Sequence, residues 1–184
     1  MIVIGNGTSR TKINLNYFHE EKIGCNAIFR DYYVEHLVCC DKRIVKQALP
    51  FHKNIYTRSR WNDEFKVNSV PNLPYEGKDR KDDPFHWGTG PYAVLLGATL
   101  SKKIKMIGFD LYGMKGKVNN VYSGTEGYSS KDSSQVDNSY WLYQISKIFE
   151  YYPNTHFKIY QDKDWQFPEA WNLANVSLDT LDNF

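Results

Sequence analysis

The residues best suited to contact a phosphate follow the first apolar segment of the chain. Residues 1–5 are apolar and β-branched, end in Gly5, and lead into Asn6, Gly7 and Thr8. Glycines let a backbone approach a phosphate closely, and free N–H groups or the Asn6 amide can donate hydrogen bonds to it. The segment matches neither the P-loop pattern nor the full glycine-rich dinucleotide motif. A tight turn after a strand therefore remains an equal alternative.

A second phosphate-binding candidate precedes an apolar helix. Gly88, Thr89 and Gly90 lead into Pro91 and the apolar residues 92–100. Proline is favoured in the first turn of a helix, and the free N–H groups and dipole of that turn attract anions. The alternative is that these glycines only allow the chain to enter a buried helix.

Two polar residues interrupt or end apolar strand-like segments. Asn26 lies within residues 23–29, where a buried amide needs a partner such as a base edge, a ribose hydroxyl or neighbouring backbone. Asp41 ends residues 36–41, where its carboxylate can accept from a ribose or an amino group. Asp41 also stands where a helix cap is expected, and in that role it needs no ligand.

The remaining candidates are an acid for nucleotide binding, and two tyrosines and a histidine for catalysis. Asp110 follows another short strand, and Tyr112 and Tyr122 carry hydroxyls that can stabilise a departing phosphate. His86 is the only histidine beside a candidate ligand loop, which makes it a candidate base. The chain has no HExxH or GxSxG motif, and its three cysteines have no zinc-site spacing, so no metal site is predicted.

Length and composition limit the class of protein. A chain of 184 residues fits one domain, and its 41% apolar and 16% aromatic content allows a real core. The net charge of +2 does not indicate purely electrostatic nucleic-acid binding, although it does not exclude nucleic acid. No apolar run approaches the ~18–20 residues that cross a bilayer, and the N-terminus lacks a signal-peptide pattern. We expect a cytoplasmic protein.

The elements that must position these residues alternate between strands and helices. We expect strands at 1–5, 23–29, 36–41, 54–57, 105–110 and 156–160, and helices at 42–49, 91–100 and 137–151. Residues 58–85 show little periodicity and read as an irregular excursion. Residues 111–134 have the length and composition of a lid or binding loop. This alternation predicts an α/β fold, a mostly parallel sheet with helices on both faces. Such sheets bind ligands beyond the strands' carboxyl ends, where chain order reverses.

Several of these segments together resemble a known family. The matching pieces are residues 2–9, 24–26, 88–93 and 104–112. In order and spacing they resemble the family 42 glycosyltransferases, which are bacterial sialyltransferases of lipo-oligosaccharide synthesis. More distantly they resemble archaeal 6-hydroxymethylpterin pyrophosphokinase-like proteins. The resemblance covers most of residues 1–160, with sparse identities, and the block ending in residues 108–112 is its strongest part.

The resemblance implies a fold and a reaction. The fold would be a single Rossmann-like domain over residues 1–160, with a lid at 111–134 and residues 161–184 packed on it. The donor would be a nucleotide sugar, with cytidine as its base, and no cofactor would be required. The small size suits a compact, virus-encoded version of the family.

The resemblance also implies roles for individual residues. Asn6 and Gly7 would approach the donor phosphate or ribose. The nucleotide would meet Asn26 and lie against Thr89 and Gly90. The two tyrosines that help the phosphate leave would be Tyr112 and Tyr122.

One departure from the family concerns the base. The family has a histidine ahead of the late helix, whereas residues 133–138 contain none. Asp137 or His86 would have to replace it.

Two other functions fit the same residues. A nucleotide pyrophosphokinase would need Mg²⁺, with Asp41 and Asp110 as the available ligands. A non-catalytic protein would have kept the nucleotide site and lost the base. The acceptor is not visible in the sequence, and the aromatic C-terminal tail is a candidate interface for a homo-oligomer.

Overall fold

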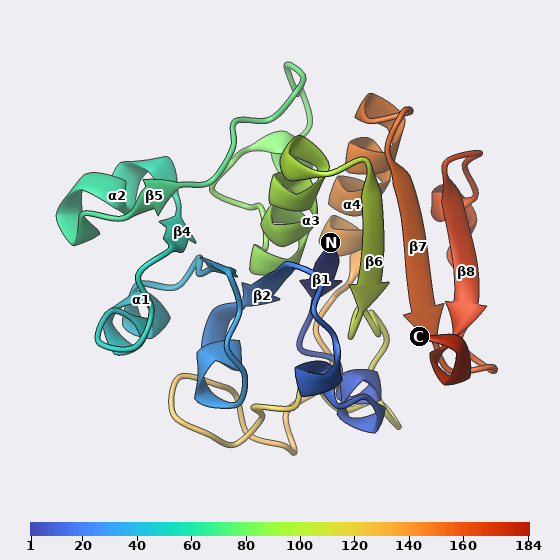
Figure 1. Ribbon diagram of the computed structural model, residues 1–184, viewed down its shortest axis with the longest axis horizontal. Helices are drawn as coiled ribbons and strands as arrows, with labels where there is room; N and C mark the ends of the chain where they lie inside the picture. The colour runs from blue at the N-terminus through green and yellow to red at the C-terminus, as the bar shows by residue number, and fades with distance from the viewer.

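The computed structural model describes all residues from Met1 to Phe184, and its centre is one eight-stranded sheet. The strands are β1 (Ile2–Ile4), β2 (Lys22–Cys25), β3 (His36–Val38), β4 (Ile55–Thr57), β5 (Asn68–Ser69), β6 (Lys103–Ile107), β7 (His156–Gln161) and β8 (Val176–Thr180). Their spatial order is β5-β4-β3-β2-β1-β6-β7-β8, and every neighbouring pair is parallel (Figure 1). The expected parallel sheet is confirmed.

Helices cover both faces of this sheet, as the sequence predicts. They are α1 (Lys42–Ala48), α2 (Ser59–Phe65), α3 (Thr89–Leu100) and α4 (Ser139–Tyr151). Val3 belongs to the buried cluster on the side of α3 and α4, whereas Ile2 and Ile4 belong to the cluster that includes α1. Because successive strand residues point to opposite faces, β1 is buried on both sides. The architecture is an α/β Rossmann-like fold.

The chain order reverses between β1 and β6. From β1 the chain adds β2, β3, β4 and β5 on one side, then returns through α3 to place β6 on the other side of β1. The loop of residues 111–134, yellow in Figure 1, lies at the end of the molecule to which the arrowheads of β6, β7 and β8 point. The carboxyl ends of β1 and β6 therefore form the switch point at which such folds bind ligands.

Three local expectations were wrong. The second strand ends at Cys25, because Asn26 takes a left-handed φ of 49° and starts a 3-10 helix, Asn26–Arg30. The stretch 58–85 is not wholly irregular, since it contains α2 and β5. The final segment, for which no strand was expected, contributes β8, which pairs with β7 along five residues. None of the helices combines the length and apolar character that crossing a membrane requires.

Candidate functional site

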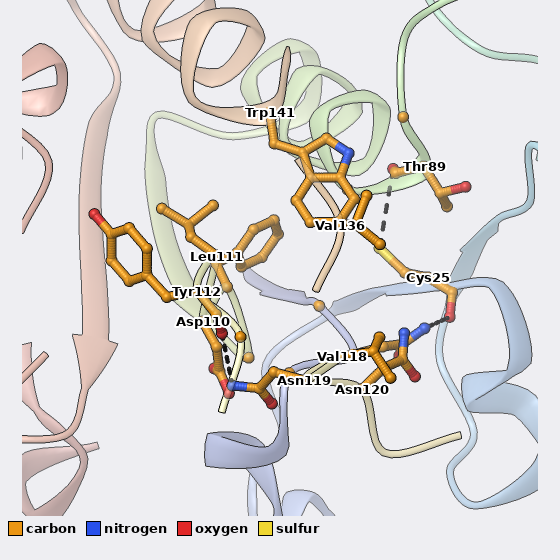
Figure 2. A pocket seen from close by; sticks show the side chains of 18 of the residues that line it. Cys25, Thr89, Asp110, Leu111, Tyr112, Val118, Asn119, Asn120, Val136 and Trp141 are labelled. Atoms are coloured by element: carbon orange, nitrogen blue, oxygen red, sulfur yellow. Dashed lines mark hydrogen bonds between the residues drawn. The ribbon is translucent and has the colours of Figure 1, made fainter. Parts of the chain in front are cut away.

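A cavity of ≈ 380 Å³ lies at the switch point (Figure 2). Its walls come from the carboxyl ends of β1, β2 and β6, the first turn of α3, the 111–134 loop and the start of α4. The Trp141 indole lies on the α4 side of the cavity, across from Asn119 and Asn120 of the loop (Figure 2). Nine residues that the sequence singled out line it: Gly5, Asn6, Gly7, Asn26, Gly88, Thr89, Gly90, Asp110 and Tyr112.

Two glycines let the chain segments beyond β1 and β6 meet at the bottom of this cavity. The Gly5 amide donates to the Ile107 carbonyl at 2.8 Å, and the Gly7 amide donates to the Gly108 carbonyl at 2.8 Å. A Cβ added to Gly5 would lie 2.3 Å from the Gly108 carbonyl oxygen. Gly108 itself has a φ of +72°, which favours glycine. Gly5 therefore allows a close approach to the backbone of Gly108, and not to a phosphate.

Gly7 packs directly against the carboxylate of Asp110. A Cβ on Gly7 would lie 2.2 Å from the carboxyl carbon of Asp110. The Asp110 carboxylate accepts from the Ser9 amide at 2.9 Å, from the Ser9 hydroxyl and from Gln161 Nε2 at 3.1 Å. A buried carboxylate with this many donors ties β1, β6 and β7 together. It is not free to act as a base or as a metal ligand.

The first turn of α3 offers unused hydrogen-bond donors to the cavity. Gly88 caps the helix without a side chain, and its own amide donates to Gln144 Oε1 at 3.3 Å. The amides of Thr89 and Gly90 have no acceptor within the protein, as expected for the start of a helix. A Cβ on Gly90 would meet only Phe109, at 3.4 Å. Here, unlike at Gly5, the missing side chain leaves open space beside a free donor.

The hydroxyl of Thr89 and the amide of Asn26 fix the shape of this corner. Thr89 Oγ1 donates to Asn26 Oδ1 at 3.2 Å and accepts from the Cys40 amide at 3.4 Å. The Cys25 thiol contacts the Thr89 carbonyl oxygen at 3.9 Å (Figure 2). These bonds join the ends of β2 and β3 to α3, and they leave the two Asn26 Nδ2 protons without an acceptor in the protein.

Asn6 and Tyr128 form a second polar corner, next to Asn26. Asn6 Nδ2 donates to the Cys25 carbonyl at 3.1 Å and to Tyr128 Oη at 3.5 Å, while Asn6 Oδ1 is buried without any partner. The Ala27 amide also donates to Tyr128 Oη, at 3.3 Å. Burial raises the pKa of Tyr128 to about 12, so its hydroxyl keeps a proton. That corner therefore offers a ligand one acceptor and one donor.

Sequence reasoning missed Tyr128 and chose Tyr122. Tyr122 lies outside the cavity: Arg10 Nη2 donates to Tyr122 Oη at 2.7 Å, and Tyr122 Oη donates to Asp31 Oδ2 at 2.6 Å. Burial and the hydrogen bond to Asp31 raise the pKa of Tyr122. Both tyrosines occupy the same loop, and no spacing in the sequence distinguishes them.

We expect Tyr122→Phe to act on stability rather than on ligand binding. The substitution removes both hydrogen bonds of the Tyr122 hydroxyl and leaves Nη2 of Arg10, a residue only 3% exposed, with the 3.4 Å bond to Asp31 alone. The expected cost is about 1–3 kcal/mol in the free energy of unfolding, measured by urea denaturation. Tyr17→Phe, at a side chain 78% exposed, is the control and should change stability by less than about 0.5 kcal/mol. Loss of ligand binding with unchanged stability would contradict this assignment.

Tyr112 lines the cavity with part of its chain, but its ring points elsewhere. In Figure 2 the ring points away from Thr89 and Trp141, and its centre lies 6.1 Å from the Trp165 ring. The Asn119 side-chain amide donates to the Tyr112 carbonyl at 3.2 Å. Tyr112 therefore shapes the loop, and its hydroxyl is not placed beside the unpaired donors of α3.

The other candidates lie outside the cavity. The Asp41 carboxylate accepts from the Arg43 amide at 2.8 Å and caps α1, which is the ligand-free alternative for that residue. Thr8 bonds to Asn119, with its amide at 3.0 Å and its hydroxyl at 2.7 Å from Asn119 Oδ1. His86 Nε2 accepts from Arg80 Nε at 3.4 Å. These residues hold chain segments around the site and do not line it.

Asp137 follows the lining residue Val136 but also caps the start of a helix. Its carboxylate accepts from the Ser139 amide at 2.9 Å and from the Ser139 hydroxyl at 3.0 Å. Both hydrogen bonds stabilise the charged carboxylate and so lower the pKa of Asp137, and the bond from the Ser139 amide has the larger effect. A carboxyl with a lowered pKa is a weaker general base.

The cavity has almost no formal charge. Asp110 is the one ionisable acid among its lining residues, which include no lysine, arginine, histidine or glutamate. Burial raises the pKa of the Cys25 thiol to about 12, which keeps this lining cysteine in its unreactive form. Recognition in this cavity therefore depends on backbone amides, amide side chains and one phenol.

Comparisons with known proteins name no relative: no family model, no curated protein and no solved structure matches the chain.

Proposed function

We propose that this protein binds the nucleotide part of a nucleotide sugar in the switch-point cavity and transfers the sugar to an acceptor hydroxyl. The observation that carries the proposal is the pair of unused amide donors, Thr89 and Gly90, at the start of a buried helix. These donors and the helix dipole suit a phosphate. The acceptor Asn6 Oδ1 and the donors of Asn26 and Tyr128 suit the hydroxyls and base of a nucleoside.

In the proposed reaction the oxygen of the acceptor hydroxyl forms a bond to the anomeric carbon of the sugar, and the hydroxyl proton passes to water. The bond between that carbon and the phosphate oxygen breaks, and the nucleotide leaves with the electron pair. The α3 amides and the Tyr128 hydroxyl would stabilise the negative charge on the leaving phosphate. We expect the 111–134 loop, which lines one wall, to act as the lid. The three free, buried cysteines fit a reducing cytoplasm.

A non-catalytic nucleotide-binding protein is the second candidate. It is favoured by one observation: no lining side chain is a free general base, because the Asp110 carboxylate is fully engaged. The pyrophosphokinase alternative has less support. Its two proposed Mg²⁺ ligands, Asp41 and Asp110, are not brought together, and no group of three or more His, Cys, Asp or Glu side chains could hold a metal ion.

A thermal-shift screen against CMP, CDP, UDP, GDP and ATP tests the binding site. Ligands that bind only the native state raise the melting temperature, and we expect a pyrimidine nucleotide to raise it most. Gly90→Val should abolish the shift, because its side chain would fill the space beside the free amide donors. The control is Ala170→Val, which places the same side chain at an exposed site. Gly116 cannot serve as the control position, because its φ of +75° would strain a valine. Equal shifts in all three proteins would refute the site.

Release of free nucleotide from a nucleotide sugar separates the two candidates. A transferase should release nucleotide slowly with water as acceptor, and Gly90→Val should stop this release. A thermal shift without any release from CMP-, UDP- or GDP-linked sugars would support the non-catalytic candidate instead.

A further inference from the structure

A cluster of arginines and aromatic rings lies beside the start of α3, outside the cavity. The guanidinium carbon of Arg60 lies 4.4 Å from the centre of the Phe85 ring and 4.8 Å from the centre of the Trp61 ring. The guanidinium carbon of Arg58 lies 5.6 Å from the Phe85 ring and 5.7 Å from the Trp61 ring. We call Arg58, Arg60, Trp61 and Phe85 the arginine–aromatic cluster.

The two arginines of this cluster differ in what they do for the fold. Arg58 donates to the carbonyl of Trp87 at 2.7 Å and to that of Pro84, so it holds the segment that leads into α3. Arg60 is exposed and makes no hydrogen bond or ion pair. Phe85 is 52% exposed. The cluster therefore presents the free guanidinium N–H groups of Arg60 beside the part of the Phe85 ring that Arg60, Arg58 and His86 leave exposed.

The charges around the cluster are of both signs, and its two arginines form no ion pair. Arg80 makes only the long contact to His86, and Lys81 lies over the Tyr143 ring, 5.2 Å from its centre; neither forms an ion pair. Among the nearby carboxylates, Glu64 pairs with Lys42, whereas Asp79, Asp82 and Asp83 accept hydrogen bonds from backbone amides and form no ion pair.

The cluster is fixed relative to the α3 end of the cavity. Arg58 Nε donates to the Cys40 carbonyl at 3.5 Å, and the Cys40 amide donates to Thr89 Oγ1 at 3.4 Å. From the α4 side, Gln144 bonds both to the His86 carbonyl and to the Gly88 amide. A partner on the cluster would therefore lie next to the α3 end of the site.

We propose that the arginine–aromatic cluster binds single-stranded nucleic acid. A base would stack on the exposed Phe85 ring, and phosphates would accept from the free N–H groups of Arg60 and Arg80. A single strand fits better than a duplex, because the bases of a duplex are already stacked on each other. It also fits better than a lipid surface, because the cluster has no exposed aliphatic side chain. One further step rests on the proposed sugar transfer. If that transfer is correct, the bound single strand carries the acceptor hydroxyl.

Fluorescence anisotropy with a labelled, mixed-sequence single-stranded oligonucleotide tests this inference. We expect Arg60→Ala and Phe85→Ala each to weaken binding by at least about tenfold. Lys102→Ala removes the same charge from an exposed residue at the opposite end of the strands, before β6, and should weaken binding less than about twofold. Arg60→Ala should melt within about 4 °C of the wild type, because the Arg60 side chain makes no hydrogen bond or ion pair and its contacts with the Trp61 and Phe85 rings are at the surface.

Four results would overturn the inference, three of them with nucleic acid. These three are no binding to the single strand at low salt, equal losses in Arg60→Ala and Lys102→Ala, and equal or tighter binding of a duplex of the same sequence. Arg60-dependent binding to anionic vesicles with none to the oligonucleotide would also overturn it. The nucleotide-induced thermal shift is measured on the same variants. A protein that shows the nucleotide-induced thermal shift but does not bind the oligonucleotide rejects only the proposal for the cluster. A protein that binds the oligonucleotide but shows no nucleotide-induced thermal shift rejects only the proposal for the cavity.

Discussion

Gly5→Ala is expected to lower the free energy of unfolding by about 3 kcal/mol. The added Cβ would lie 2.3 Å from the Gly108 carbonyl oxygen and 2.9 Å from its carbonyl carbon. These atoms belong to backbone that is itself hydrogen-bonded to Gly7, so they cannot rotate away as a side chain would. The exits of β1 and β6 would have to separate. Urea denaturation, with the midpoint and slope fitted together, measures the loss.

Gly90→Ala is the matched control for this prediction. Its Cβ would meet only Phe109, at an ordinary 3.4 Å, and alanine is a better helix former than glycine. We expect its stability to lie within about 1 kcal/mol of the wild type. Similar losses of stability in Gly5→Ala and Gly90→Ala would mean that the contact between Gly5 and the Gly108 carbonyl is looser than described.

Gln144→Leu is expected to cost about 2–4 kcal/mol. Gln144 is fully buried and makes three hydrogen bonds: Nε2 donates to the carbonyls of Lys81 and His86, both at 3.1 Å, and Oε1 accepts from the Gly88 amide at 3.3 Å. Leucine has similar volume but leaves the backbone partners buried and unpaired. Because Gly88 caps α3, we also expect the nucleotide-induced thermal shift to decrease.

The control for Gln144→Leu is Gln166→Leu, at an exposed position, which should change stability by less than about 0.5 kcal/mol. Urea denaturation measures both variants. A stable Gln144→Leu protein with an undiminished nucleotide shift would show that this glutamine does not hold the start of α3.

The parts of the fold that sequence reasoning predicted correctly carry strong local signals. The run at β1 is apolar and β-branched, and Pro91 marks the start of α3, so the element types follow from short-range chemistry. The parallel order of the strands then places Asn6, Asn26 and Thr89 around one cavity. Their convergence was predictable because the carboxyl ends of parallel strands share one edge.

The parts that were missed depend on contacts between distant segments. Asn26 leaves the strand at a positive φ, and its side chain accepts from Thr89, 63 residues later. Residues 176–180 pair with β7 along their whole length although none of their side chains is buried, so the strand depends on that pairing. Whether Tyr122 or Tyr128 faces the cavity is decided by Arg10 and Asp31, which lie far from both in the sequence. The same holds for Gly5 and Gly7, whose small size serves protein contacts that a single sequence does not reveal.

A crystal structure of the protein with the nucleotide that gives the largest thermal shift tests the central claim most directly. We predict that phosphate oxygens lie about 3 Å from the amide nitrogens of Thr89 and Gly90, with the nucleoside between the Trp141 side and the Asn6–Tyr128 corner. A nucleotide bound elsewhere on the molecule, or bound in the cavity with its phosphate away from the start of α3, would contradict that claim.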